Sequence, residues 1–171
     1  LVRPPRIKQA ITLSDMMFSE PLGLEMLYAL LIDEHDVEIF DMMCDRDTLE
    51  TKLKAFKADM VGVTSLCIDV DEVLRLTRQV KSSNSDIVTM VGGTQAYLNP
   101  KSFLDDSVDY IFKFTTRENV SSFFNEMTTK AHAKKDISYI KGILAKTSGY
   151  LGEGEIGRNE YILPNRESTA K

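Results

Sequence analysis

Several residue types that mark particular classes of protein are scarce in this chain of 171 residues. Its two cysteines, Cys44 and Cys67, are too few for a disulfide framework or for the thiolates of an iron–sulfur cluster. Its two histidines, His35 and His132, stand far apart in the sequence and form no metal-binding pattern. The scarcity of cysteine makes a reducing cytoplasm the default expectation for its location.

Long apolar runs and an excess of positive charge are also missing. No stretch approaches the roughly 20 apolar residues that span a bilayer, and the N-terminus has no apolar core of signal-peptide type. The 21 basic and 26 acidic residues give a net charge of -5, which argues against a nucleic-acid partner. The chain has no P-loop, nucleophile elbow or paired-carboxylate pattern, so no motif predicts independent catalysis.

Short apolar segments alternate with amphipathic segments along the first 135 residues. We expect strands at 7–14, 36–42, 59–66, 86–93 and 108–114, and helices at 23–35, 45–58, 69–83, 100–106 and 117–133. The second helix has Asp45 or Asp47 as its expected N-cap, and Pro100 starts the short fourth helix. The third strand is a nearly continuous apolar run, which predicts burial on both of its faces.

This alternation predicts an α/β fold of flavodoxin-like type. Its core would be a doubly wound, five-stranded parallel sheet with right-handed crossovers and strand order 2-1-3-4-5. Residues 136–171 differ in pattern and predict a small C-terminal β extension, a hairpin followed by an extended connector. We therefore divide the chain into an α/β domain, 1–135, and a hairpin and connector, 136–171.

The carboxyl ends of three expected strands carry small or hydroxyl-bearing residues. They are Thr64, Ser65 and Leu66 after the third strand, Gly92, Gly93 and Thr94 after the fourth, and Phe114, Thr115 and Thr116 after the fifth. Each group by itself is typical of a β–α turn. Ligands of open parallel sheets bind outside the carboxyl ends of the strands, so the coincidence predicts a pocket at this edge. The paired glycines indicate either a turn or a close approach to the backbone.

Other polar and sulfur-bearing residues are interpreted as structural. We expect Cys67 to be a small buried core residue and Asp69 and Asp71 to cap or charge the start of the third helix. His35 ends the first helix, where it would cap carbonyl groups or face solvent. The methionine pair at 16–17, in the first loop, would form either an apolar floor for a ligand or a gap-filling contact.

Landmarks in the sequence occur in an order that indicates a family. They are "PLGL" at 21–24, "ADMVGVTSL" at 58–66, "VGGTQAYLNP" at 91–100, "VDYIFKF" at 108–114, "IKGILAKTSG" at 140–149 and "LPNR" at 163–166. Together they resemble the cobalamin-binding N-terminal domain of cobalamin-dependent radical S-adenosylmethionine enzymes, a group that includes anaerobic magnesium-protoporphyrin monomethyl ester cyclases. The resemblance covers nearly the whole chain and rests on order and spacing rather than on one motif.

The resemblance implies a cobalamin site at the predicted edge. Thr64 and Leu66 would border the nucleotide tail of the cofactor, and Gly92 and Gly93 would leave room for it. Leu22, Gly23, Ser65, Thr94, Phe114 and Thr115 complete the implied cofactor-binding set.

The resemblance also implies a partner domain. The parent enzyme would carry a 4Fe-4S cluster and S-adenosylmethionine on a downstream radical domain, whose Cys-x-x-x-Cys-x-x-Cys motif is absent here. This chain would then be a binding module that is not catalytic alone, in a parent enzyme of methyltransferase or tetrapyrrole oxidative cyclase type.

Two departures from the family pattern keep alternatives open. The first loop, "SDMMFSEPLG" at 14–23, has no histidine of the Asp-x-His-x-x-Gly kind, so no protein histidine is expected on cobalt. "FTTR" at 114–117 replaces the usual Gly-Glu-Gly-Glu, and the "GEGE" at 152–155 lies in the late hairpin.

A degenerate cobalamin fold used as an interaction domain is one alternative. A receiver-like or flavodoxin-like regulatory module is the other, although a receiver needs an acidic pair after the first strand and an aspartate ending the third. Asp15 stands alone, and Thr64 and Ser65 occupy the second place.

Overall fold

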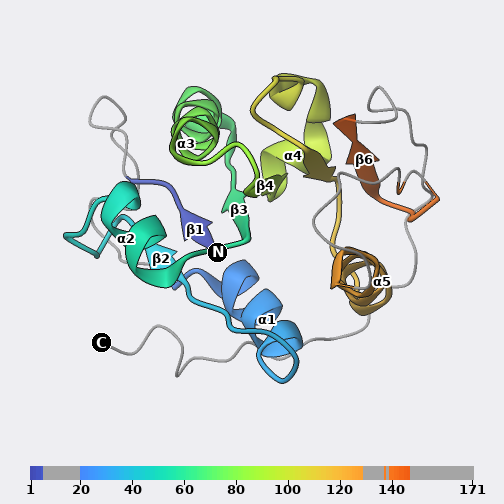
Figure 1. Cartoon of the computed structure of the whole chain (residues 1–171). Helices are drawn as coiled ribbons and strands as arrows, with labels where there is room; N and C mark the ends of the chain where they lie inside the picture. The colour runs from blue at the N-terminus through green and yellow to red at the C-terminus, as the bar shows by residue number, and fades with distance from the viewer. Residues whose placement is uncertain (6–19, 129–136, 138, 147–171) are drawn as a thin grey trace.

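Strands and helices alternate along the chain in the computed structural model, which describes residues 1–5, 20–128, 137 and 139–146 (Figure 1). The strands are β1 (Val2–Arg3), β2 (Phe40–Asp41), β3 (Met60–Thr64), β4 (Val88–Gly92), β5 (Tyr110–Phe112) and β6 (Ile143–Ala145). The α-helices are α1 (Leu22–Leu31), α2 (Leu49–Phe56), α3 (Val70–Ser83), α4 (Thr94–Leu98) and α5 (Arg117–Thr128). Two 3-10 turns, η2 (Cys67–Asp69) and η3 (Pro100–Phe103), complete the described elements.

The strands form one sheet in the order β2-β1-β3-β4-β5-β6. The first five are parallel, which confirms the predicted flavodoxin-like α/β fold and its 2-1-3-4-5 order. β6 adds a sixth strand antiparallel to β5, with Ile143 opposite Phe112 and Ala145 opposite Tyr110. The described part of the C-terminal β extension therefore joins the edge of the main sheet. The rest of the predicted hairpin and connector, including "GEGE" and "LPNR", lies outside the described residues.

The sequence pattern did not predict the strand β1, which occupies Val2–Arg3 between β2 and β3. The predicted strand at 7–14 lies outside the described residues. Two prolines follow at 4–5, and proline ends a central strand because it has no N–H to donate. Arg3 also contacts β2 through an ion pair of 3.1 Å with Asp41. Two residues are too short for an alternation pattern, which is why the sequence did not reveal this strand.

Helices cover both faces of the sheet (Figure 1). α3 and α4 lie on one face and α1 and α5 on the other, while α2 packs against α3. On β3, Val61 and Val63 are buried beneath α3, but Met60, Gly62 and Thr64 are only half-buried. The prediction that β3 is buried on both faces is therefore wrong for the face toward α1 and α5. That incomplete cover creates space for a site.

The helix starts follow from capping chemistry. Thr48, rather than Asp45 or Asp47, caps α2, and its hydroxyl accepts a hydrogen bond of 3.2 Å from the Thr51 N–H. Both aspartates instead lie within 3.6 Å of the Lys52 ammonium group. The sequence missed the short helix α4, but Pro100 occupies the first turn of η3 as predicted.

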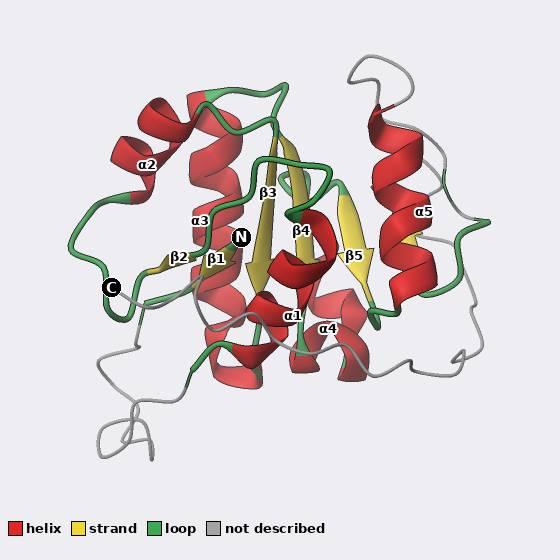
Figure 2. Ribbon diagram, turned by 90° about the horizontal axis from the view of Figure 1, so that it is seen from below, coloured by secondary structure: helices red, strands yellow, loops and turns green. Residues whose placement is uncertain are grey.

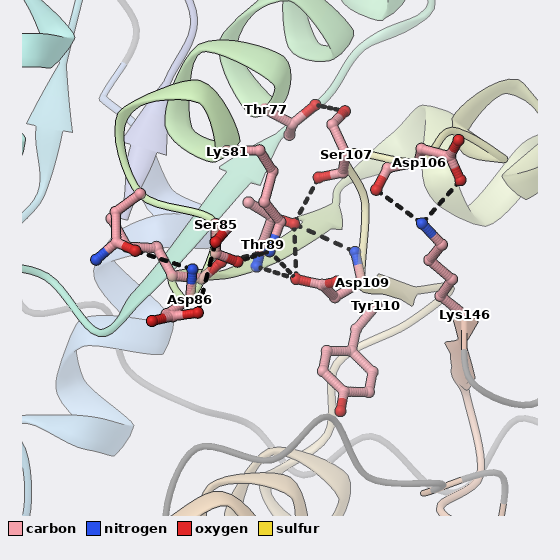
Figure 3. Close-up of polar contacts among 12 residues, drawn as sticks. Thr77, Lys81, Ser85, Asp86, Thr89, Asp106, Ser107, Asp109, Tyr110 and Lys146 are labelled. Carbon is pink, nitrogen blue, oxygen red and sulfur yellow. Dashed lines mark hydrogen bonds and ion pairs between the residues drawn. The ribbon is translucent and has the colours of Figure 1, made fainter.

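A buried polar network closes the opposite, amino edge of the sheet (Figure 3). The Lys81 ammonium group of α3 forms an ion pair with Asp109, which precedes β5 and is 2% exposed. The same carboxylate accepts a hydrogen bond of 3.0 Å from the Thr89 N–H of β4. The Thr89 hydroxyl donates to the Ser107 carbonyl oxygen at 2.6 Å, and the Ser107 hydroxyl lies 2.8 Å from that of Thr77. These bonds tie α3, β4 and β5 together away from the candidate site.

Candidate functional site

The candidate site is a cavity of about 130 Å³ on the sheet face between α1 and α5. Its lining includes residues where β3, β4 and β5 end, and Figure 2 shows these strands running in the same direction. Because parallel strands present their carboxyl ends at one edge, the predicted location of the pocket agrees with this geometry.

The lining is almost entirely apolar. Gly62 of β3 and Met90 of β4 form its floor, and α1 and α5 supply aliphatic and aromatic walls, chiefly Leu24, Leu27, Leu31, Val120 and Phe124. Thr64 and Thr115 add hydroxyl groups near the strand ends. A concave apolar surface with a few polar groups at its mouth suits a flat, largely apolar ligand group with a polar attachment.

Gly62 keeps the floor of the cavity open. A Cβ at this position would lie 3.5 Å from the Leu1 Cδ2 and 3.7 Å from the Met90 Cε, which are ordinary contacts. The backbone therefore tolerates a side chain here, and the glycine is not needed for its conformation. A larger side chain would project into the cavity and occupy it.

Gly93 has a different reason to be glycine. Its φ of 96° and ψ of -174° lie in a region that only glycine adopts without strain. A Cβ would also lie 2.7 Å from the Ser65 backbone nitrogen and oxygen and 2.8 Å from the Thr64 Oγ1. Both a turn and a close backbone approach thus require this glycine. Gly92 has no positive φ, and a Cβ there would meet the Phe112 Cβ at 3.6 Å.

The structure brings half of the predicted site residues to the cavity. Those that line it are Gly23, Thr64, Gly92, Gly93 and Thr115.

The other five predicted residues lie around the cavity rather than in its lining. Leu22 and Leu66 are 44% and 53% exposed at the same edge, and Thr94 is the exposed first residue of α4. The ring of Phe114 packs over Gly142, and the side chain of Ser65 is buried in a bond to the Gly92 carbonyl oxygen.

Sequence reasoning missed the deep part of the cavity. Gly62 and Met90 lie inside apolar strand runs, and Leu27, Leu31 and Phe124 looked like ordinary core positions of amphipathic helices. Gly62 carried the one available signal, because an isolated glycine within a strand indicates close approach of another group.

The "FTTR" loop is held by the start of α5. The Thr116 N–H donates to the Asn119 side-chain oxygen at 2.8 Å, and the Asn119 N–H donates to the Thr116 hydroxyl at 3.1 Å. The Asn119 amide group also donates to the carbonyl oxygens of Phe114, at 3.0 Å, and Lys141, at 3.1 Å. This reciprocal cap fixes Thr115 at the cavity, while Arg117 is exposed.

The loop after β3 corrects one prediction. Cys67 is exposed rather than buried, because the η2 turn carries residues 66–68 out of the sheet. Asp69 anchors this turn: its carboxylate accepts a hydrogen bond of 3.1 Å from the Leu66 N–H. Partial burial raises the pKa of the Asp69 carboxyl above its ordinary value.

The described residues offer no evident metal ligands at this edge. His35 lies beyond the far end of α1, with its ring 5.3 Å from that of Phe124, and borders a second, wider groove of about 650 Å³. Within the described ranges, no three His, Cys, Asp or Glu side chains are grouped to hold a metal ion. His132, Asp15 and the methionines at 16–17 lie outside the described residues.

The helices of the described part are also too short or too polar to cross a membrane.

Comparison with known proteins gives two positive findings. The sequence profile of a protein family described as "B12 binding domain" matches residues 10–121. A protein of Pyrococcus horikoshii named as an uncharacterized methyltransferase is 24% identical over 149 residues, which cover 84% of this chain and 30% of the relative. The chain therefore spans less than a third of the length of that relative. No solved structure matches the chain significantly.

Proposed function

The chain belongs to the B12-binding domain family, and from this premise we propose that it binds cobalamin with the nucleotide tail of the cofactor in the cavity between α1 and α5. The apolar lining with a glycine floor is the observation that carries the proposal. A planar aromatic base fits such a lining, and the Thr64 and Thr115 hydroxyls lie where the polar part of the tail would leave. Leu66, which is exposed at the same edge, would border the tail outside the cavity.

The positions of the histidines bear on whether this domain supplies a ligand to cobalt. The first-loop sequence contains no histidine, and His35 lies at the opposite end of α1. We therefore propose that the cobalamin carries no imidazole ligand from this domain. When bound, the cofactor would supply methyl-carrier or radical-assisting chemistry, and this chain would hold and orient it.

We further propose that the chain is the cobalamin module of a larger radical S-adenosylmethionine enzyme, of methyltransferase or tetrapyrrole oxidative cyclase type. Support comes from the order of sequence landmarks and from the relative whose name describes a methyltransferase. The 4Fe-4S cluster and S-adenosylmethionine would belong to the other domain of that enzyme, and a cytoplasmic location fits such chemistry.

Two variants on one strand test the cavity assignment. Gly62→Val places methyl groups in the cavity and favours a strand conformation, so we expect unchanged or higher thermal stability. The affinity for hydroxocobalamin should fall at least tenfold, because the tail loses its space. The matched control is the neighbouring Val61→Ala, which removes packing on the opposite face and lowers stability by about 1–3 kcal/mol. It should leave cobalamin affinity unchanged.

Binding is measured by titration of the corrin absorption and by retention of colour after desalting, and stability by thermal unfolding. Equal affinity of the Gly62→Val variant and the wild type would place the tail elsewhere. A folded wild-type protein that retains no cobalamin would favour the degenerate fold used as an interaction domain.

A further inference from the structure

The buried hydroxyl group of Ser65 lies where two loops of the candidate site meet. Ser65 directly follows β3 and is 1% exposed, and its Oγ donates a hydrogen bond of 2.7 Å to the Gly92 carbonyl oxygen. The Ser65 carbonyl oxygen accepts a hydrogen bond of 3.2 Å from the Gln95 N–H in α4. Ser65 follows Thr64, which is the last paired residue of β3, and its hydroxyl bonds Gly92, which is the last paired residue of β4.

Gly93 packs directly against the Ser65 backbone at the junction between the loop after β3 and the start of α4. Its Cα lies so close to Ser65 that an added Cβ would be 2.7 Å from two backbone atoms of the serine. The loop after β3 is thus joined to the end of β4 by the hydroxyl bond, to α4 by the carbonyl bond, and to Gly93 by direct contact of backbone with backbone. The serine hydroxyl is occupied by the protein and is not presented to the cavity.

We propose that Ser65 is a positioning residue for the cofactor site, an inference that rests on the proposed cobalamin function. By joining the loop after β3 to the end of β4 and the start of α4, it fixes the two flanking residues, Thr64 at the cavity and Leu66 at the exposed edge. Preorganised contacts bind more tightly, because less conformational entropy is lost when the ligand arrives. The effect of Ser65 on affinity therefore acts through its neighbours.

Two matched substitutions separate positioning from general stability. Ser65→Ala removes a buried hydroxyl-to-carbonyl bond at the site. Thr89→Val, at the opposite end of the same sheet, removes a buried hydroxyl that bonds the Ser107 carbonyl oxygen and also the carboxylate and N–H of Asp109, so it disturbs at least as many bonds. Both variants should unfold at lower temperature. Only Ser65→Ala should weaken hydroxocobalamin binding, by about tenfold, with faster dissociation. Equal affinities of the two variants would show that Ser65 is merely structural.

Hydrogen exchange provides a readout that needs no cofactor. The Gln95 amide hydrogen, which bonds to the Ser65 carbonyl oxygen, should exchange about tenfold faster in Ser65→Ala and at the wild-type rate in Thr89→Val. Unchanged protection of Gln95 in Ser65→Ala would refute the positioning role of Ser65 whether or not cobalamin binds. If Gln95 exchanges faster in Ser65→Ala but the wild-type protein binds no cobalamin, Ser65 holds a purely structural junction. That result would refute both the cofactor role of Ser65 and the proposed function.

Discussion

Replacing Gly93 by alanine should damage the fold far more than the same change at Gly92. At a φ of 96° and ψ of -174°, a residue with a Cβ is strained by roughly 1–3 kcal/mol. The new methyl group would lie 2.7 Å from the Ser65 backbone nitrogen and oxygen, neither of which can rotate away. Overpacking of this kind costs about 1–3 kcal/mol more. We expect Gly93→Ala to lower the free energy of unfolding by about 2–6 kcal/mol.

For a domain of this size, such a loss lowers the thermal midpoint by roughly 10 °C. The measurement is urea unfolding followed by circular dichroism, with thermal unfolding in parallel. Gly92→Ala is the control, because its methyl group would meet the Phe112 Cβ at an ordinary 3.6 Å and should cost less than about 1 kcal/mol. A loss below about 1 kcal/mol for Gly93→Ala, or equal losses for the two variants, would refute the reasoning.

Three further predictions concern stability away from the cavity. Lys81→Met removes the cation beside the buried Asp109 carboxylate, so the free energy of unfolding measured in urea should fall by about 3–5 kcal/mol. A negligible change would mean that the ion pair does not stabilise the fold. The hydrogen bond from Arg78 lowers the pKa of Asp105 to about 2 from an ordinary 3.8. The charged Asp105 carboxylate therefore stabilises the fold above about pH 4, and this stabilisation is lost as the pH falls toward 2. Asp105→Asn should therefore flatten stability between those pH values in an acid titration, and an unaltered profile would contradict the assignment. Thr48→Ala removes the N-cap of α2 and should cost about 1 kcal/mol in thermal or urea unfolding, whereas no loss would show that α2 does not depend on that cap.

The position of each predicted site residue shows where sequence reasoning succeeded. The location of the site at the carboxyl ends of β3, β4 and β5 could be predicted, because chain direction alone brings those ends to one edge of a parallel sheet. Thr64, Gly92 and Thr115 accordingly line the cavity. Cys67, one residue beyond Leu66, could not be predicted, because a 3-10 turn leaves the sheet without any periodic signal.

The alternation of elements, the strand order and the family could be predicted from the residues alone, because they depend on local hydrophobic periodicity, chain direction and the order of short motifs. The role of each small residue became clear only from the folded structure. Gly62 lines the cavity at a position whose backbone would accept a side chain, whereas Gly93 is glycine because its φ is positive and Ser65 lies against it. The side chain of Ser65 binds the protein itself. These differences depend on contacts between residues about 30 positions apart, such as Ser65 and Gly92. The two loops that carry them meet only when β3 pairs with β4, so no local sequence pattern predicts the distances between them.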